Sequence, residues 1–295
     1  MIALLTDSRY LNPENPNWYV QNILDDDRHL MEGLAKHGIR TVRVNWADAD
    51  FDWTQVQAAV FRTTWDYFEK FDQFRSWLEK VQGRFPLHNS AELVRWNWDK
   101  HYLKDLERLG IRIPPTRVFE VGESVRLQEL LDEFQCAGGI VKPTVSGAAL
   151  HTYRFSRMEF ETVEKLANSL LRSRAMIFQP FQNSVVERGE LSLIVIDGNV
   201  THAVKKVAKP GDFRVQDDHG GKAFSHEASI EEILFAEKAV RACPTLPVYA
   251  RVDIIQDNEG KLAVMELEVI EPELFLRFSP KAAHILADVL AERLT

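Results

Sequence analysis

The chain has 295 residues, of which 45% are hydrophobic and 10% aromatic, so it can form a real core and is not a disordered segment. Its formal net charge is −8 at pH 7, which argues against a general binder of nucleic acid or of anionic membranes, because such proteins need a basic surface. Its two cysteines, Cys136 and Cys243, lack metal-type spacing, and no apolar run reaches the ~20 residues of a membrane span, so we expect a reduced, cytoplasmic protein.

The first third of the chain alternates strands and helices. Strands are predicted at residues 2–6, 41–45 and 58–62 and from Leu87, and helices at 27–37 and 68–81. This β-α-β-β-α-β order predicts an open, mainly parallel α/β sheet, with ligands beyond the carboxyl ends of its strands. Three polar residues near those ends are candidate substrate contacts: Ser8, Thr64 and Asp66. The alternative is that "TTWDY" forms a turn and helix cap whose aromatic residues pack in the core.

The remaining two thirds are richer in antiparallel patterns. Helices are predicted at 99–109, 127–134, 161–173, 229–242 and 279–294, and strands after Pro114-Pro115-Thr116, within 138–155, at 175–181, in a hairpin over 189–209 and at 249–256. Asp197-Gly198 is a strong signal for the hairpin turn.

Two lysines and a small-residue loop indicate a phosphate site. Lys142 lies in the apolar strand "GGIVKPT", where an unpaired ammonium group costs several kcal/mol unless it faces an anion. Snorkelling from an edge strand is the alternative. The following "TVSGAA" lets backbone N–H groups approach an oxyanion, although the Walker A pattern is absent. Lys100, at a helix start, is a surface residue by default.

The stretch "VMELEVIEPELF" places two glutamates on one face of a strand. Glu266 and Glu268 alternate with apolar residues, and a hairpin brings them beside Asp253 of "RVDII". Three carboxylates on one face repel one another unless a cation lies between them, and ligation by oxygen alone suits Mg²⁺ or Mn²⁺. Glu271 and Glu273 follow in a loop that we expect to be solvated or to face the substrate.

Taken in order, these motifs resemble the ATP-grasp superfamily, in the branch that contains glutathione-synthetase-like enzymes and the cyclo-ligase that closes the cycloserine ring. The resemblance implies an ATP-grasp fold of mixed α/β (α+β) class with a Rossmann-like N-terminal domain. It implies three parts: a substrate domain at 1–95, a central subdomain with the phosphate loop at 96–182, and a C-terminal subdomain with the metal site at 183–295. Two departures are Glu266-Leu267-Glu268, where many relatives have Glu-x-Asn, and a phosphate loop poor in glycine.

The resemblance also implies roles for single residues. ATP would be bound by Lys100, Lys142, Lys206 and the loop residues Ser146 and Gly147, with adenine at Gln179 and Phe181 and ribose at Glu190. Two Mg²⁺ ions, or Mn²⁺, would bind to Asp253, Glu266 and Glu268. Arg214 would approach the transferred phosphate and Arg251 the oxyanion of the second step, while His219 and Glu273 are possible substrate contacts.

The implied reaction is ATP-dependent ligation of a small amino-acid-like or peptide carboxylate to an amine through an acyl phosphate, releasing ADP and phosphate. No nucleic acid or membrane partner is expected, and a homodimer is possible. An intramolecular cyclo-ligase and a non-catalytic nucleotide-binding module are alternatives. A dinucleotide enzyme is disfavoured, because no G-x-G-x-x-G follows the first strand.

Overall fold

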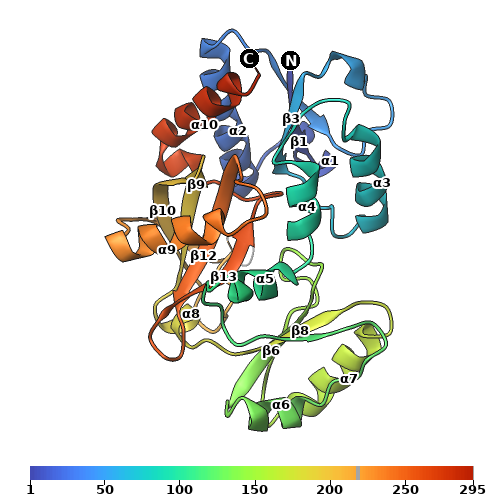
Figure 1. Ribbon diagram of the computed structural model, residues 1–295, viewed down its shortest axis with the longest axis vertical. Helices are drawn as coiled ribbons and strands as arrows, with labels where there is room; N and C mark the ends of the chain where they lie inside the picture. Colours follow the sequence, from blue (N-terminus) through green and yellow to red (C-terminus); the bar gives the residue numbers. More distant parts are fainter. Residues whose placement is uncertain (217–219, 295) are drawn as a thin grey trace.

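The first sheet is parallel and has the strand order β2-β1-β3-β4. The computed structural model describes residues 1–216 and 220–294 (Figure 1). The strands of this sheet are β1 (Ile2–Thr6), β2 (Thr41–Asn45), β3 (Ala58–Thr63) and β4 (Leu87–His88), and its helices are α1 (Ser8–Leu11), α2 (Trp18–Lys36), α3 (Phe71–Val81) and a 3-10 turn at Trp53–Gln55. The predicted α/β class and the parallel sheet are confirmed.

Helix α2 is longer than the predicted helix at 27–37. It begins at Trp18 because the side chain of Asn17 caps it, accepting a hydrogen bond from the backbone N–H of Val20. The helix then extends over its amphipathic second half, where Leu30 and Leu34 are buried.

The second sheet is antiparallel and has the order β5-β8-β6-β7. Its strands are β5 (Arg117–Phe119), β6 (Gly138–Pro143), β7 (Tyr153–Ser156) and β8 (Met176–Pro180), and α6 (Leu127–Glu133) and α7 (Phe160–Leu170) pack against it. Two helices, α4 (Ala91–Asn97) and α5 (Tyr102–Arg108), precede this sheet in place of the single helix predicted at 99–109. Ser90 caps α4 through the N–H of Leu93, which explains the extra helix.

The third sheet is antiparallel and has the order β11-β10-β9-β12-β13. Its strands are β9 (Glu190–Ile196), β10 (Asn199–Val207), β11 (Lys222–His226), β12 (Tyr249–Gln256) and β13 (Leu262–Glu268). The helices of this part are α8 (Ser184–Glu187), α9 (Ile230–Arg241), α10 (Pro280–Glu292) and a 3-10 turn at Leu276–Phe278. The predicted β9–β10 turn is confirmed, since both Asp197 and Gly198 have positive φ.

The last helix returns to the first sheet. Figure 1 shows α10 beside α2. A Cβ atom at Gly33 of α2 would lie 2.8 Å from the Cβ of Ala287 in α10, so glycine is needed for this close approach. Helix α10 thereby ties the end of the chain to its beginning.

The proposed boundaries after residues 95 and 182 stay a prediction; the first falls inside α4. Among the residues that the structure describes, no helix combines the length and the apolar character that a bilayer span requires.

Candidate active site

The three predicted metal ligands lie on neighbouring strands of the third sheet. Asp253 of β12 pairs directly with Glu266 of β13, and a bulge follows, because Ile254 pairs with Val264 and leaves Met265 over. One carboxylate oxygen from each of Asp253, Glu266 and Glu268 can be chosen so that all three lie within 4.8 Å of one another. This acidic trio consists of oxygen ligands alone, which fits Mg²⁺ or Mn²⁺.

Arginine and lysine side chains already neutralise part of the acidic trio. Arg251 donates to Asp253 at 2.9 Å and to Glu268, and Lys206 lies 3.0 Å from Asp253 and 2.6 Å from Glu190. Although burial opposes its charge, these cations hold the pKa of Asp253 well below its usual value. The ionised form of Asp253 is therefore favoured, and Arg251 and Lys206 already bind its carboxylate oxygens.

The other end of the acidic trio is less well neutralised. Burial, together with the charges of Glu266 and Asp253, raises the pKa of Glu268 to about 8. Burial and the charges of Glu268 and Glu266 raise the pKa of Glu271 well above its usual value. Arg251 offsets only part of this effect, so a further cation that enters this part of the cavity would favour the ionised form of both carboxyl groups.

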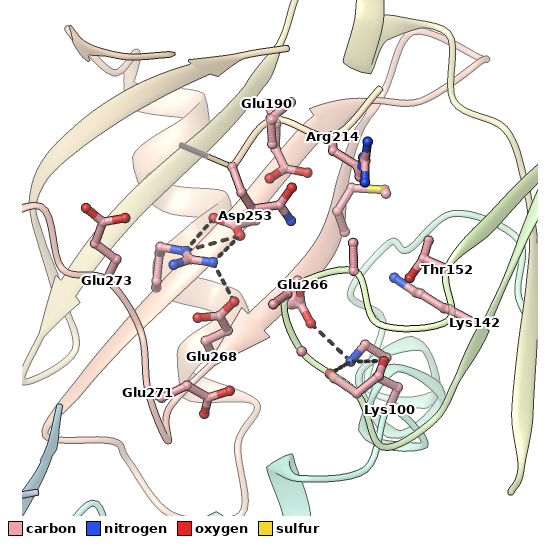
Figure 2. A pocket seen from close by; sticks show the side chains of 18 of the residues that line it. Lys100, Lys142, Thr152, Glu190, Arg214, Asp253, Glu266, Glu268, Glu271 and Glu273 are labelled. Atoms are coloured by element: carbon pink, nitrogen blue, oxygen red, sulfur yellow. Dashed lines mark hydrogen bonds and ion pairs between the residues drawn. The ribbon is translucent and has the colours of Figure 1, made fainter. Parts of the chain in front are cut away.

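The two predicted lysines lie beside the acidic trio (Figure 2). The Nζ of Lys100 donates to the backbone oxygen of Ser146 at 2.6 Å and lies 3.3 Å from Glu266. Burial lowers the pKa of Lys142, and no hydrogen bond or ion pair of its ammonium group is found within residues 1–216 and 220–294. A half-buried ammonium group that has no protein partner among the described residues suits an anionic ligand.

The loop after β6 has an unusual backbone. Ala148, Ala149 and His151 have positive φ values of 46°, 56° and 53°. A Cβ atom at Gly147 would lie 2.4 Å from the ring of Phe68, so only glycine lets the loop approach the first α/β part this closely. The loop is thus held in place by a segment distant in sequence.

One cavity of about 300 Å³ collects most of the predicted site. The predicted residues that line it are Lys100, Lys142, Ser146, Gly147, Gln179, Phe181, Glu190, Lys206, Arg214, Arg251, Asp253, Glu266, Glu268 and Glu273. Gln179 is buried and donates to Thr116 at 2.9 Å, and Arg214 pairs with Asp212 at 2.8 Å.

Three predicted substrate contacts do not line this cavity, and a fourth lies outside the described residues, namely His219. Ser8 is exposed in α1, and Thr64 is fully buried. Asp66 is buried and accepts hydrogen bonds from Trp46 and Lys70, both at 2.6 Å. Thr64 and Asp66 are thus buried, whereas Trp65 and Tyr67 of the same segment line the cavity, and the assignment of Ser8, Thr64 and Asp66 as substrate contacts stays a prediction.

The cavity also has residues outside the predicted set of site residues. Four come from the first α/β part, namely Arg9, Tyr10, Tyr19 and Trp65. The indole of Trp65 donates to the backbone oxygen of Glu271 at 2.8 Å, so it reaches the loop after β13. The position of Trp65 at the carboxyl end of β3 was a sequence signal for a ligand site. Its contact with Glu271 could not be predicted, because the two residues are distant in sequence.

Side chains of α4 and α5 support the acidic strand from outside. Strand β13 is the edge of its sheet, and Asn97 donates to the oxygen of Leu267 at 2.7 Å and accepts from the N–H of Val269 at 3.0 Å. The hydroxyl of Tyr102 accepts from the N–H of Leu267 at 3.0 Å. These bonds satisfy backbone groups that an edge strand otherwise leaves unpaired.

Comparisons with known proteins identify the family of this chain. Residues 2–89 match the family model "D-cycloserine synthetase DcsG, N-terminal domain", and residues 100–274 match "RimK-like ATP-grasp domain". The chain is 31% identical over 281 residues to the cycloserine biosynthesis protein DcsG of Streptomyces lavendulae, covering 90% of this chain and 92% of that protein. It is 30% identical over 193 residues to a probable α-L-glutamate ligase of Stutzerimonas stutzeri, covering 64% of this chain and 60% of that protein.

A solved structure has the same architecture. The crystal structure of D-cycloserine synthetase DcsG superposes with a TM-score of 0.89 at 30% sequence identity, covering 100% of this chain and 99% of that one.

Proposed function

Because this chain belongs to the RimK-like ATP-grasp family of ligases, we propose that it joins a carboxylate to an amine or related nucleophile through an acyl phosphate, with release of ADP and phosphate. The substrate is a small amino-acid-like or peptide compound. The three predicted parts, 1–95, 96–182 and 183–295, serve as substrate domain, phosphate-loop subdomain and metal-bearing subdomain.

The observation that carries this proposal is that lysine ammonium groups and a cluster of carboxylates line the same cavity. Lys100 and Lys142 lie on one side and the acidic trio on the other (Figure 2). Neither group is suited to a neutral ligand. Together they suit a nucleoside triphosphate with its metal ions, because Mg²⁺ is commonly held by one or two carboxylates plus substrate phosphates.

The acidic trio fits the metal by its donor set. Asp253, Glu266 and Glu268 would hold Mg²⁺, in two ions by our proposal, with Mn²⁺ as a possible substitute. The ions would neutralise negative charge on the phosphates and on the reacting carboxylate.

The other residues bind and orient the nucleotide. Lys100 and Lys142, with Ser146 and Gly147 of the loop, would contact phosphates. Gln179 and Phe181 would contact adenine and Glu190 the ribose. Glu190 already pairs with Lys206 at 2.6 Å, so a ribose hydroxyl would share this carboxylate with the lysine.

Two arginines would stabilise charge that develops during the reaction. Arg251 is held by Asp253 and Glu268, and this fixes its guanidinium group beside the acidic trio. A preorganised donor of this kind stabilises the oxyanion formed when the nucleophile attacks, an effect of roughly 10²–10³ in rate. Arg214 would serve the transferred phosphoryl group. A binding module without turnover does not need these arginines, which favours an enzyme.

A second candidate is intramolecular ring closure. The similarity to a cycloserine biosynthesis protein over 90% of the chain, including the N-terminal domain, favours it. The test is release of ADP and phosphate with single amino acids and dipeptides, then with pairs of compounds. Turnover with one compound supports the cyclo-ligase, and a requirement for two supports intermolecular ligation. Absence of turnover across a broad panel, with ATP still bound, would favour the non-catalytic module.

A further inference from the structure

The end of the cavity next to the first α/β part is lined by residues that the proposed function does not assign to the nucleotide or the metal, such as Tyr10, Tyr19, Trp65 and Glu271. Figure 2 shows Glu271 and Glu273 across the acidic trio from Lys100 and Lys142. The cavity lining continues from these glutamates to aromatic residues of the first α/β part. A substrate whose carboxylate lies at the acidic trio would extend into this end.

The side chains of Trp65 and Tyr19 form an aromatic wall beside Glu271. Trp65 is anchored by its hydrogen bond to the backbone oxygen of Glu271, at 2.8 Å. The ring of Tyr19 stacks on Trp65 with centroids 6.0 Å apart, and Tyr10 meets it edge-on at 5.3 Å. The wall therefore presents π-electron density from a fixed position, and a cation is attracted to such a surface.

The cationic side chains at this end already have carboxylate partners. Arg9 pairs with Asp7 at 2.7 Å, and Arg277 pairs with Glu273 at 2.5 Å. By contrast, in the part of the chain that the structure describes, the carboxyl group of Glu271 has no hydrogen bond and no ion pair. Glu271 is also only partly exposed, so water satisfies it incompletely.

We propose that Glu271 and the aromatic wall of Trp65 and Tyr19 bind a protonated primary amino group of the substrate, so that the enzyme selects a compound carrying both this ammonium group and the carboxylate to be activated. The inference rests on the proposed function, since the acidic trio places the carboxylate. A charge-assisted hydrogen bond to Glu271 and the aromatic face would act on the same ammonium group.

Two other kinds of ligand fit the site beside Glu271 less well. A metal ion needs several oxygen ligands, and the ligand group found among the described residues consists of Asp253, Glu266 and Glu268 without Glu271. A neutral or apolar substrate end would leave the carboxyl group of Glu271 without a partner.

The test compares a cation with a neutral compound of the same shape. Alaninamide carries an ammonium group where lactamide carries a hydroxyl group. We would measure the binding of each by titration calorimetry or NMR, with ADP and Mg²⁺ at saturation, to the wild type, to Glu271→Gln and to Glu69→Gln. Glu69 is a matched control, because it lines the same cavity but is exposed.

The wild type and Glu69→Gln should bind alaninamide about tenfold or more tightly than lactamide, the effect of one hydrogen bond to a charged group. Glu271→Gln should lose this preference while binding ADP as the wild type does. Equal binding of the two amides by the wild type, no binding of alaninamide, or an unchanged preference in Glu271→Gln would overturn the inference. A change in Mg²⁺ affinity without a change in alaninamide binding would also overturn it, in favour of a metal.

The ADP measurement separates this inference from the proposed function. If ADP binds with Mg²⁺ but the amide preference is absent, only the ammonium subsite is wrong. If the wild type does not bind ADP, the proposed function itself is wrong. Should Glu271→Gln fail to bind ADP, Trp65→Leu decides in its place, because it removes the aromatic wall and should also reduce the preference for alaninamide.

Discussion

Replacing Glu266 by glutamine should remove ATP turnover while leaving the fold almost as stable as the wild type. The side chain of Glu266 is 30% exposed, and its one ion pair among the described residues is with Lys100 at 3.3 Å. Lys100 keeps its hydrogen bond to Ser146 when that charge is lost. A partly exposed pair contributes about 1 kcal/mol or less, and the loss of one like charge near Glu268 offsets part of it. Turnover should fall by roughly 10²-fold or more, because the metal loses a charged ligand.

Asp253→Asn is the informative comparison. Asp253 is 2% exposed and is bound by Arg251 at 2.9 Å and Lys206 at 3.0 Å. Removing one partner of buried ion pairs costs about 3–5 kcal/mol, since both cations stay buried with less compensation. This variant should also lose turnover, but with a fall in melting temperature of roughly 10 °C.

The assays are ADP release and thermal unfolding of both variants, with and without Mg²⁺. Mg²⁺ with ADP should raise the melting temperature of the wild type more than that of Glu266→Gln. Turnover near that of the wild type in Glu266→Gln would refute the metal assignment. A Glu266→Gln protein as unstable as Asp253→Asn would refute the distinction drawn from their contacts.

Two further predictions concern stability. Asn97→Ala should lower the free energy of unfolding by about 2–4 kcal/mol, because the oxygen of Leu267 and the N–H of Val269 lose their buried partner; denaturation in urea within 1 kcal/mol of the wild type would contradict this. Burial and the charge of Glu273 raise the pKa of Asp26 to about 6, so the stability from its protonated form is complete below about pH 4 and is lost as pH rises through about 6. Relative to Asp26→Asn, the wild type should therefore lose roughly 2–2.5 kcal/mol between pH 4 and pH 7, and an equal difference at both pH values would be the contrary result.

The sequence predicted the strands better than the helix starts. The predicted spans 2–6, 41–45 and 249–256 match β1, β2 and β12, because each has a clear apolar pattern bounded by polar residues. The helix predicted from residue 99 begins instead at Tyr102. The N–H of Lys100 bonds to the oxygen of Thr144, a contact between segments that local patterns do not contain.

The family resemblance drawn from ordered motifs is confirmed by the match of residues 100–274 to the RimK-like ATP-grasp domain. The roles assigned to single residues remain predictions. What the sequence could not supply were contacts across the parts of the chain. Trp65 meets Glu271, and Gly147 packs against Phe68, because the chain folds back on itself.

The acidic strand shows why such contacts matter to function. Side chains alternate along a strand, so a shift of β13 by one residue would turn Glu266 and Glu268 to the opposite face. As an edge strand, β13 has one neighbour, β12, to fix its register. The bulge at Met265 and the side chain of Asn97 add further constraints, and Asn97 belongs to a helix that contributes no carboxylate to the acidic trio. The position of the predicted metal ligands is thus set partly by a residue outside the acidic trio, and Asn97 carries little sign of that role in the sequence.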